Sequence, residues 1–338
     1  MGLIEIDGSY GEGGGQVLRT AVGLSAATGR ACRVRNVRKG RSNPGLAAQH
    51  LQGVRAVART CDGELEGDEK GSTEVEFRPE KLDPPRSMSV DIGTAGSVTL
   101  LLQALMIPLQ AAGRTVEVQV RGGTHVKWSP TADYFAQVFA WFLGRMGTRV
   151  RLLEVRPGFY PKGGGLLRLE VQPGPLAALN LTRRDDLETV SALSIASEKL
   201  RDARVAERQL EGVRQVLEPD RQSHRYVGGP SVGTAVLAWA DYGNCRLGAS
   251  ALGERGKPAE TVGAEAAVRL RDQMETPGCL DRHMADQILP YLPMAEGDSE
   301  VRMAEVTGHC RTCIWVIEQF LPARFEADEG AGLIACRP

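Results

Sequence analysis

Residues 7–38 read DGSYGEGGGQVLRTAVGLSAATGRACRVRNVR, and the same organisation returns in residues 91–121, DIGTAGSVTLLLQALMIPLQAAGRTVEVQVR. In each stretch a glycine-rich turn leads into a segment with the apolar spacing of a helix, then an A-x-G-R turn, then a strand of alternating valines. The offset between the copies is 84 residues both at the opening Asp and at the Gly of the A-x-G-R turn. This ungapped internal repeat predicts two copies of one supersecondary unit.

The segments that follow the two copies also match. A Pro-opened helix and two strands come after each copy, so each unit is expected to run β-α-β-α-β-β. A third unit starts near Gly278, and residues 181–277 before it have a different rhythm of strands and helices. The sequence therefore predicts an α/β (α+β) protein. Residues 1–180 and 278–338 form its large three-unit domain, and residues 181–277 form a smaller inserted α/β domain.

Composition limits the classes of protein to consider. The chain has 338 residues, of which 42% are hydrophobic and 25% are charged, as in soluble globular proteins. Its formal net charge of -1 means that nucleic acid would have to be bound by a local basic patch. The N-terminus resembles no signal peptide, and the longest apolar stretch, residues 98–113, is too short to span a bilayer. We expect a cytoplasmic protein with no membrane partner, in which the seven cysteines are reduced thiols.

The glycine-rich turn of the first unit, residues 11–16 (GEGGGQ), runs into the start of a helix. Free backbone N–H groups and the helix dipole attract anions at such a place, although the glycines could also serve only a tight turn. Glu12 favours the first interpretation, because a carboxylate inside a phosphate cradle needs a divalent cation between itself and the phosphate.

A basic turn follows the second strand of the first unit. Arg38 and Arg41 stand just before a Pro-opened helix that carries Gln49 and His50. Arginine matches the geometry of phosphate oxygens, whereas the ordinary alternative is a solvated basic turn. The corresponding position in the second unit carries His125, Trp128, Ser129, Pro130 and Asp133. Another glycine-rich segment, residues 159–165, is expected to be a hairpin loop.

The third unit carries TGHCRTC at the expected start of its second helix. His309, Cys310 and Cys313 supply at most three zinc ligands, and the chain has no second C-x-x-C or H-x-x-H motif. A redox pair would place a thiol at the exposed first position, where this chain has the histidine. The helix dipole disfavours imidazolium and lowers the pKa of His309, and a neutral imidazole is a nucleophile. We therefore favour a nucleophile over a metal or redox site.

Taken together, these residues resemble the RNA 3′-terminal phosphate cyclase family from end to end. The stretches that carry the resemblance are DGSYGEGGGQVLR, RKGRSNPGLAAQHL, IGTAGSVTLLLQ, GFYPKGGG, ADQILPYLPMA and GHCRTCIWVIEQFLPARF. The resemblance implies an enolpyruvyl transferase-like large domain and conversion of an RNA 3′-phosphate to a 2′,3′-cyclic phosphate. It also implies ATP, a divalent cation (Mg²⁺ or Mn²⁺) and RNA 3′-phosphate ends as partners, with histidine–AMP and RNA-(3′)pp(5′)A intermediates.

The resemblance also implies roles for single residues. His309 would be the nucleophile, and Glu12 would bind the metal. The nucleotide would be bound by Gln103, Pro130, Asp133, His283, Asp286 and Gln287. The phosphates and the RNA end would be bound by Arg19, Arg38, Arg41, Gln49 and His50.

Two departures from the family pattern concern positions near the nucleophile and the base. Cys313 replaces the asparagine of the family's H-x-x-T-N motif, and His283 stands where other members have a tyrosine on adenine. Two other functions remain open: a catalytically silent relative that acts in ribosome or RNA assembly, and an enolpyruvyl transferase on the same fold. Retention of His309, Glu12 and Gln103 argues against the silent relative. The sequence leaves the oligomeric state open, a homodimer included.

Overall fold

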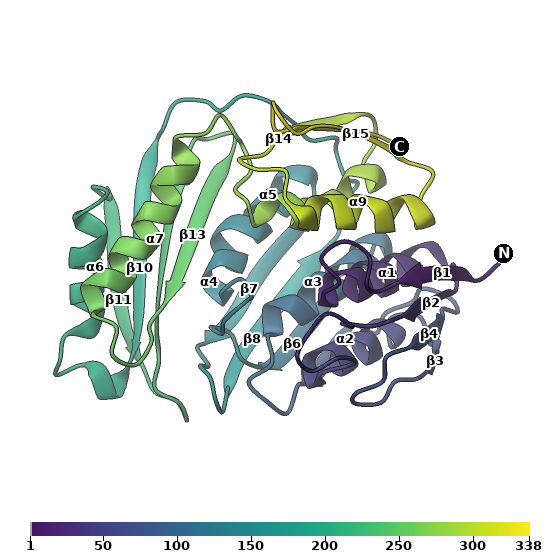
Figure 1. Cartoon of the computed structure of the whole chain (residues 1–338), viewed down its shortest axis with the longest axis horizontal. Coiled ribbons are helices and arrows are strands. Elements are labelled where there is room, and N and C mark those ends of the chain that lie inside the picture. Colours follow the sequence, from purple (N-terminus) through teal and green to yellow (C-terminus); the bar gives the residue numbers. More distant parts are fainter. Residues whose placement is uncertain (1) are drawn as a thin grey trace.

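The computed structural model describes residues 2–338, which fold into four four-stranded sheets with helices packed against them (Figure 1). Three of the sheets have the same strand order, first-second-fourth-third along each unit. This common order confirms the α/β fold with three β-α-β-α-β-β units. The first unit consists of β1 (Ile4–Asp7), α1 (Gly15–Thr28), β2 (Cys32–Arg35), α2 (Ala48–Ala58), β3 (Glu64–Glu66) and β4 (Val75–Arg78).

The second unit repeats this order with longer strands. Its second helix is interrupted by the π-turn η1. Its last two strands are antiparallel, so residues 159–164 lie in the predicted hairpin loop and Gly165 begins the last strand. The elements are β5 (Ser87–Asp91), α3 (Val98–Ala111), β6 (Val116–Gly122), α4 (Ala132–Tyr134), η1 (Phe135–Phe139), α5 (Ala140–Met146), β7 (Arg149–Arg156) and β8 (Gly165–Gln172).

The third unit is split along the chain, which corrects its expected start near Gly278. Its first strand, β9 (Asn180–Leu181), precedes the insertion and pairs in parallel with β14. Two residues are too few to show a strand pattern, so this strand was not predicted from the sequence. The remaining elements are α8 (Met284–Ile288), η3 (Leu289–Met294), β14 (Ser299–Arg302), α9 (Gly308–Phe320), β15 (Arg324–Asp328) and β16 (Leu333–Arg337).

The segment between β9 and α8 forms the fourth sheet, in the order β11-β10-β12-β13. Helices α6 and α7 cover its outer face, at the left end of the molecule in Figure 1. The other face meets the second unit, where Gly248 lies against Tyr134 and Val138. The exact boundaries of the inserted domain stay a prediction. The elements are β10 (Thr189–Ser197), η2 (Glu198–Leu200), α6 (Val205–Arg214), β11 (Arg221–Val227), β12 (Thr234–Asp241), β13 (Arg246–Leu252) and α7 (Ala259–Met274).

Helix α1 lies at the centre of the large domain and contacts both α3 and α9. At the crossing with α3, a Cβ on Gly23 would be 2.8 Å from the carbonyl oxygen of Ala104, so only glycine permits this approach. The N-termini of α1 and α9 meet where Gln16 of α1 contacts His309 of α9. No helix within residues 2–338 is long and apolar enough to cross a membrane.

Candidate active site

His309 is the second residue of α9, and the helix start holds it in place. The Thr307 hydroxyl caps the helix by accepting a hydrogen bond from the backbone N–H of Cys310 at 3.3 Å. The imidazole is half-exposed, and its Nδ1 lies 2.8 Å from Oε1 of Gln16. Partial burial lowers the pKa of His309; the negative charge of Glu12 opposes this shift, and the positive charges of Arg19 and Arg41 add to it. The ring is therefore neutral near pH 7.

The tautomer of this neutral ring follows from the contacts of Gln16. Its Nε2 donates hydrogen bonds to Oδ2 of Asp286 at 2.8 Å and to the backbone oxygen of His309 at 3.2 Å. Because both of these partners are acceptors, the amide nitrogen of Gln16 must face them. The amide oxygen, Oε1, then faces the imidazole as an acceptor. Nδ1 must then carry the proton, and Nε2 keeps its lone pair.

The glycine-rich turn packs directly against the start of α9. Gly11 has a positive φ of 58°, and a Cβ there would be 2.2 Å from Oγ1 of Thr312. A Cβ on Gly308 would be 2.6 Å from Oε1 of Glu12. Gly11 therefore needs glycine, and the turn brings Oε2 of Glu12 to 3.9 Å from Nε2 of His309.

Glu12 suits a divalent cation that is completed by other ligands. Its carboxylate is half-exposed and faces the nucleophile. Within residues 2–338 no three His, Cys, Asp or Glu side chains gather as a metal cage. One carboxylate with phosphate oxygens and water is the usual way in which Mg²⁺ is held beside a nucleotide. The residues present therefore fit a cation that arrives with its phosphate ligand.

Positive and imidazole groups line the other side of the glycine turn. A Cβ on Gly14 would be 3.2 Å from Nη2 of Arg41, and one on Gly15 would be 3.0 Å from Nη1 of Arg19 and 2.3 Å from Nε2 of His50. The missing side chains thus make room for these groups beside the turn. The arrangement gathers positive groups around the N-terminus of α1, as an anion site requires.

His50 itself is buried, with 7% of its surface exposed, and its Nδ1 has no partner among residues 2–338. Burial, with a smaller effect of Arg19 and Arg38, lowers its pKa to about 3. Between that value and the unfolded value of 6.5, His50 is neutral in the folded chain and protonated in the unfolded chain. The contribution of this pKa shift to the free energy of unfolding is therefore complete above pH 6.5, and it is lost as the pH falls from 6.5 towards 3.

This linkage predicts the behaviour of a His50→Gln variant. Its free energy of unfolding should fall less steeply with decreasing pH than that of the wild type, because glutamine takes up no proton on unfolding. Between pH 6.5 and pH 5 the difference should change by about 1.6 kcal/mol in favour of the variant. Urea unfolding across this range measures it, with His224→Gln, an exposed histidine on β11, as the matched control. Parallel curves for His50→Gln and wild type would contradict the assignment.

Asp286 and Arg19 lie behind the nucleophile in a small cavity of about 30 Å³, which also involves Gln103, Gln287 and Tyr291. Burial raises the pKa of Asp286 to about 7, although Arg19 opposes the shift. Burial likewise lowers the pKa of Arg19 to about 10. The Tyr291 hydroxyl has no partner within residues 2–338. The cavity thus has the size and the polar groups to hold a water molecule.

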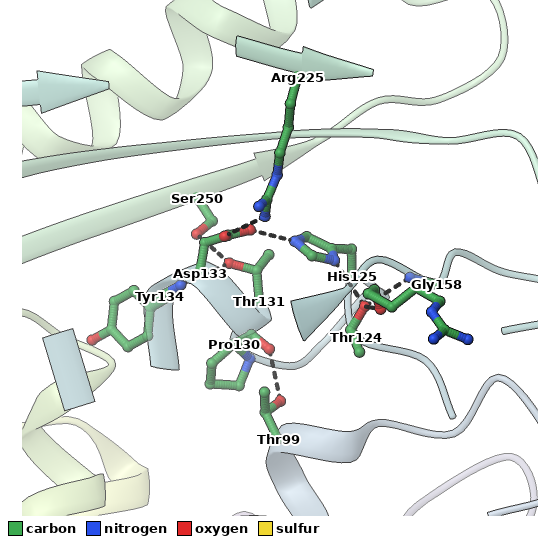
Figure 2. Close-up of polar contacts among 11 residues, drawn as sticks. Thr99, Thr124, His125, Pro130, Thr131, Asp133, Tyr134, Gly158, Arg225 and Ser250 are labelled. Carbon is green, nitrogen blue, oxygen red and sulfur yellow. Dashed lines mark hydrogen bonds and ion pairs between the residues drawn. The ribbon is translucent and has the colours of Figure 1, made fainter. Parts of the chain in front are cut away.

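Two residues expected at the nucleotide, Pro130 and Asp133, belong to a second cluster (Figure 2). Asp133 is buried and accepts hydrogen bonds from Nε2 of His125 at 2.6 Å and from Nη2 of Arg225 at 3.0 Å. The Pro130 carbonyl accepts from Oγ1 of Thr99 at 2.7 Å. Both Asp133 oxygens are occupied, and the carboxylate joins the second unit to the inserted sheet.

The remaining expected residues have structural partners of their own. Gln49 accepts a hydrogen bond from the N–H of Ser97 at 2.6 Å, and Arg38 donates to the carbonyl of Gly45 at 2.7 Å. His283 precedes α8, and burial lowers its pKa. The structure therefore gathers Glu12, Arg19, Arg41, His50, Gln103, Asp286 and Gln287 at or behind His309, and leaves Pro130 and Asp133 in the second cluster. The ligands of all these residues stay predictions.

Cys310 and Cys313 are core residues. Sγ of Cys310 contacts Oγ1 of Thr307 at 3.4 Å, and Sγ of Cys313 contacts the Asp286 carbonyl at 3.6 Å. Burial raises the pKa of Cys310 to about 11 and that of Cys313 well above its usual value. Neither thiol has the lowered pKa of a reactive cysteine.

Sequence reasoning missed two polar groups of these clusters. Gln16, which orients His309, directly follows the glycine run, so its position at a helix start was the available signal. Arg225 comes from the inserted sheet, and no local pattern connects it with Asp133.

Comparison with known proteins assigns the chain to a family. A model of the RNA 3′-terminal phosphate cyclase family matches residues 10–327. Three archaeal proteins named RNA 3′-terminal phosphate cyclase are similar over nearly their whole length. The protein from Methanopyrus kandleri is 48% identical over 96% of this chain and 95% of its own, and that from Archaeoglobus fulgidus is 43% identical over 97% and 99%. The protein from Pyrococcus abyssi is 41% identical over 98% and 96%. The chain therefore belongs to the RNA 3′-terminal phosphate cyclase family of enzymes.

Proposed function

We propose that this chain uses ATP to convert an RNA 3′-terminal phosphate into a 2′,3′-cyclic phosphate, through a covalent His309–AMP intermediate. The observation that carries the proposal is the orientation of the nucleophile. Gln16 holds the Nδ1 proton, so the lone pair of Nε2 is free beside Glu12 and the glycine turn. The family membership and the names of the relatives support the choice of RNA as substrate.

In the first step Nε2 of His309 attacks the α-phosphorus of ATP. A P–N bond forms, the bond to the β-phosphate oxygen breaks, and diphosphate leaves with the bonding electrons. Arg19 beside the turn offsets the phosphate charge. A divalent cation held by Glu12 would further neutralise the phosphate oxygens.

The second step transfers AMP to the RNA. An oxygen of the 3′-phosphate attacks the adenylate phosphorus, the P–N bond breaks, and RNA-(3′)pp(5′)A forms while His309 is regenerated. In the third step the neighbouring 2′-hydroxyl attacks the 3′-phosphorus, loses its proton and expels AMP. Its fixed proximity makes ring closure efficient, and DNA lacks this hydroxyl.

The activity is tested with an RNA that carries a labelled 3′-phosphate. Incubation with the protein, ATP and Mg²⁺ or Mn²⁺ should make the label resistant to phosphatase, while ATP is converted to AMP and diphosphate. An RNA with a 2′-deoxy terminal nucleotide should stop at the adenylated intermediate. Label that stays phosphatase-sensitive in the ribose substrate with either metal would contradict the proposal.

Gln16 is predicted to act as a positioning residue in the first step. Gln16→Ala removes the acceptor that fixes the tautomer, and loss of such a hydrogen bond should slow self-adenylation by about tenfold. Gln16→Glu keeps an acceptor at Nδ1 but adds a negative charge, which should raise the pKa of His309. As the pH is lowered, self-adenylation by Gln16→Glu should therefore begin to decline at a higher pH than self-adenylation by the wild type. Single-turnover labelling across pH measures both effects, and an unchanged pH profile in Gln16→Glu would contradict the role.

A further inference from the structure

Two aromatic side chains stand exposed on the second unit. Trp128 is 94% exposed and Tyr160 is 76% exposed, the highest values among the large apolar side chains of residues 2–338. Trp128 also has a positive φ of 59°, a conformation that bulky residues rarely adopt. Neither exposure nor this backbone conformation contributes to folding, so the two rings require another explanation.

The two loops that carry the rings lie side by side and are firmly held. The N–H groups of Thr124 and His125 donate to the carbonyl of Gly158 at 3.0 and 3.2 Å, and the N–H of Gly158 donates to Oγ1 of Thr124 at 2.7 Å (Figure 2). The N–H of Lys162 donates to Oγ of Ser231 at 3.0 Å. These contacts fix the backbone of the loops and leave the rings of Trp128 and Tyr160 uncovered.

The loop of Trp128 also occupies the position in the second unit that carries site residues in the other two units. Residues 123–131 follow the second strand of their unit, as Arg41 does in the first unit and His309 does in the third. Contacts connect these edges, because Gln49 bonds to Ser97 at the start of α3, and Glu12 packs against Gly308 at the start of α9. The Pro130 carbonyl, two residues after Trp128, also accepts a hydrogen bond from Thr99 near the start of α3, so the loop of Trp128 adjoins these connected edges.

We propose that Trp128 and Tyr160 form a stacking platform for the single-stranded RNA that precedes the terminal phosphate. This inference rests on the proposed function, since an RNA end at His309 must continue along the surface. Bases stack on exposed aromatic rings without regard to sequence, and nearby cations hold the backbone. Lys162 is exposed on one of these loops and supplies positive charge on a chain whose net charge is only -1. Lys127 is exposed on the other loop, where it pairs with Glu254 at 3.0 Å. The platform would increase the affinity for single-stranded RNA of any sequence.

Direct binding tests the platform separately from the chemistry. Fluorescence anisotropy would measure the Kd of a fluorescent single-stranded RNA of about 12 nucleotides with a 3′-phosphate, without ATP. Trp128→Ala should raise the Kd by about tenfold, and adding Tyr160→Ala should raise it further. Trp128→Phe should recover most of the affinity, because it keeps an aromatic face. Leu187→Ala, which removes another exposed apolar side chain, should bind as the wild type does.

A competition assay supplies the second readout. A dinucleotide with a 3′-phosphate is too short to cover the platform, so its affinity should change much less in Trp128→Ala than that of the longer RNA. Equal Kd values for the longer RNA in wild type and the double variant would overturn the platform and leave the proposed cyclase activity intact. Failure of the wild-type protein to cyclise either RNA would instead overturn the proposed function.

Discussion

Replacing His309 by alanine is expected to abolish covalent adenylation. With ATP labelled at the α-phosphate and Mg²⁺ or Mn²⁺, the wild-type chain should acquire label in a bond that is labile to acid, as a P–N bond is. The variant should remain at background, because no other imidazole occupies the head of α9 beside Glu12. The label is separated from free ATP by denaturing electrophoresis and counted.

His224→Ala is the matched control, since His224 lies on β11 of the inserted sheet and is 40% exposed. It should label as the wild type does. The His309→Ala protein should also be supplied with a preformed RNA-(3′)pp(5′)A. Ring closure needs only the 2′-hydroxyl and release of AMP, so this variant should still produce the cyclic end. Wild-type labelling of His309→Ala would contradict the nucleophile assignment outright.

The repeat made most of the fold predictable from the sequence. The glycine turns, the helices after them and the A-x-G-R turns recur with a constant offset, and physical periodicity is the strongest local signal a sequence carries. The split of the third unit was not predictable, because β9 has only two residues and pairs with β14 across the whole insertion. Short strands are defined by their partners more than by their own pattern.

Only some residues of the candidate site were predictable from the sequence. His309, Glu12 and Arg41 stand at element ends with unusual residue types, and the structure places all three at the glycine turn. Gln16 belongs to the same turn, but its role depends on Asp286, which is 270 residues away. Asp133 has a comparable long-range partner in Arg225. Such pairs depend on how the units pack, so no local pattern could reveal them.

Arg41→Ala is expected to give the second largest loss. The guanidinium lies beside Gly14 in the glycine turn. There it can grip the phosphate of an incoming RNA end with two parallel hydrogen bonds. Losing a charge-assisted contact costs about 1.5–3 kcal/mol, so AMP transfer should slow by roughly ten- to a hundredfold. Self-adenylation should fall much less. Arg35→Ala, an exposed arginine of the same unit that pairs with Glu5 and Glu74, is the matched control.

The two steps can be separated by charging the enzyme first. Preformed enzyme–AMP, freed of ATP and mixed with an RNA ending in a 3′-phosphate, reports transfer alone, while labelled ATP without RNA reports adenylation alone. Arg41→Lys should recover only part of the transfer rate, because an ammonium provides a point charge without the planar fork of arginine. The charge of Arg41 also contributes to the lowered pKa of His309, so its removal should move the pH dependence of adenylation slightly upward. If Arg41→Ala transfers AMP normally but fails to adenylate itself, the guanidinium binds the phosphates of ATP instead, and the RNA end must be held elsewhere.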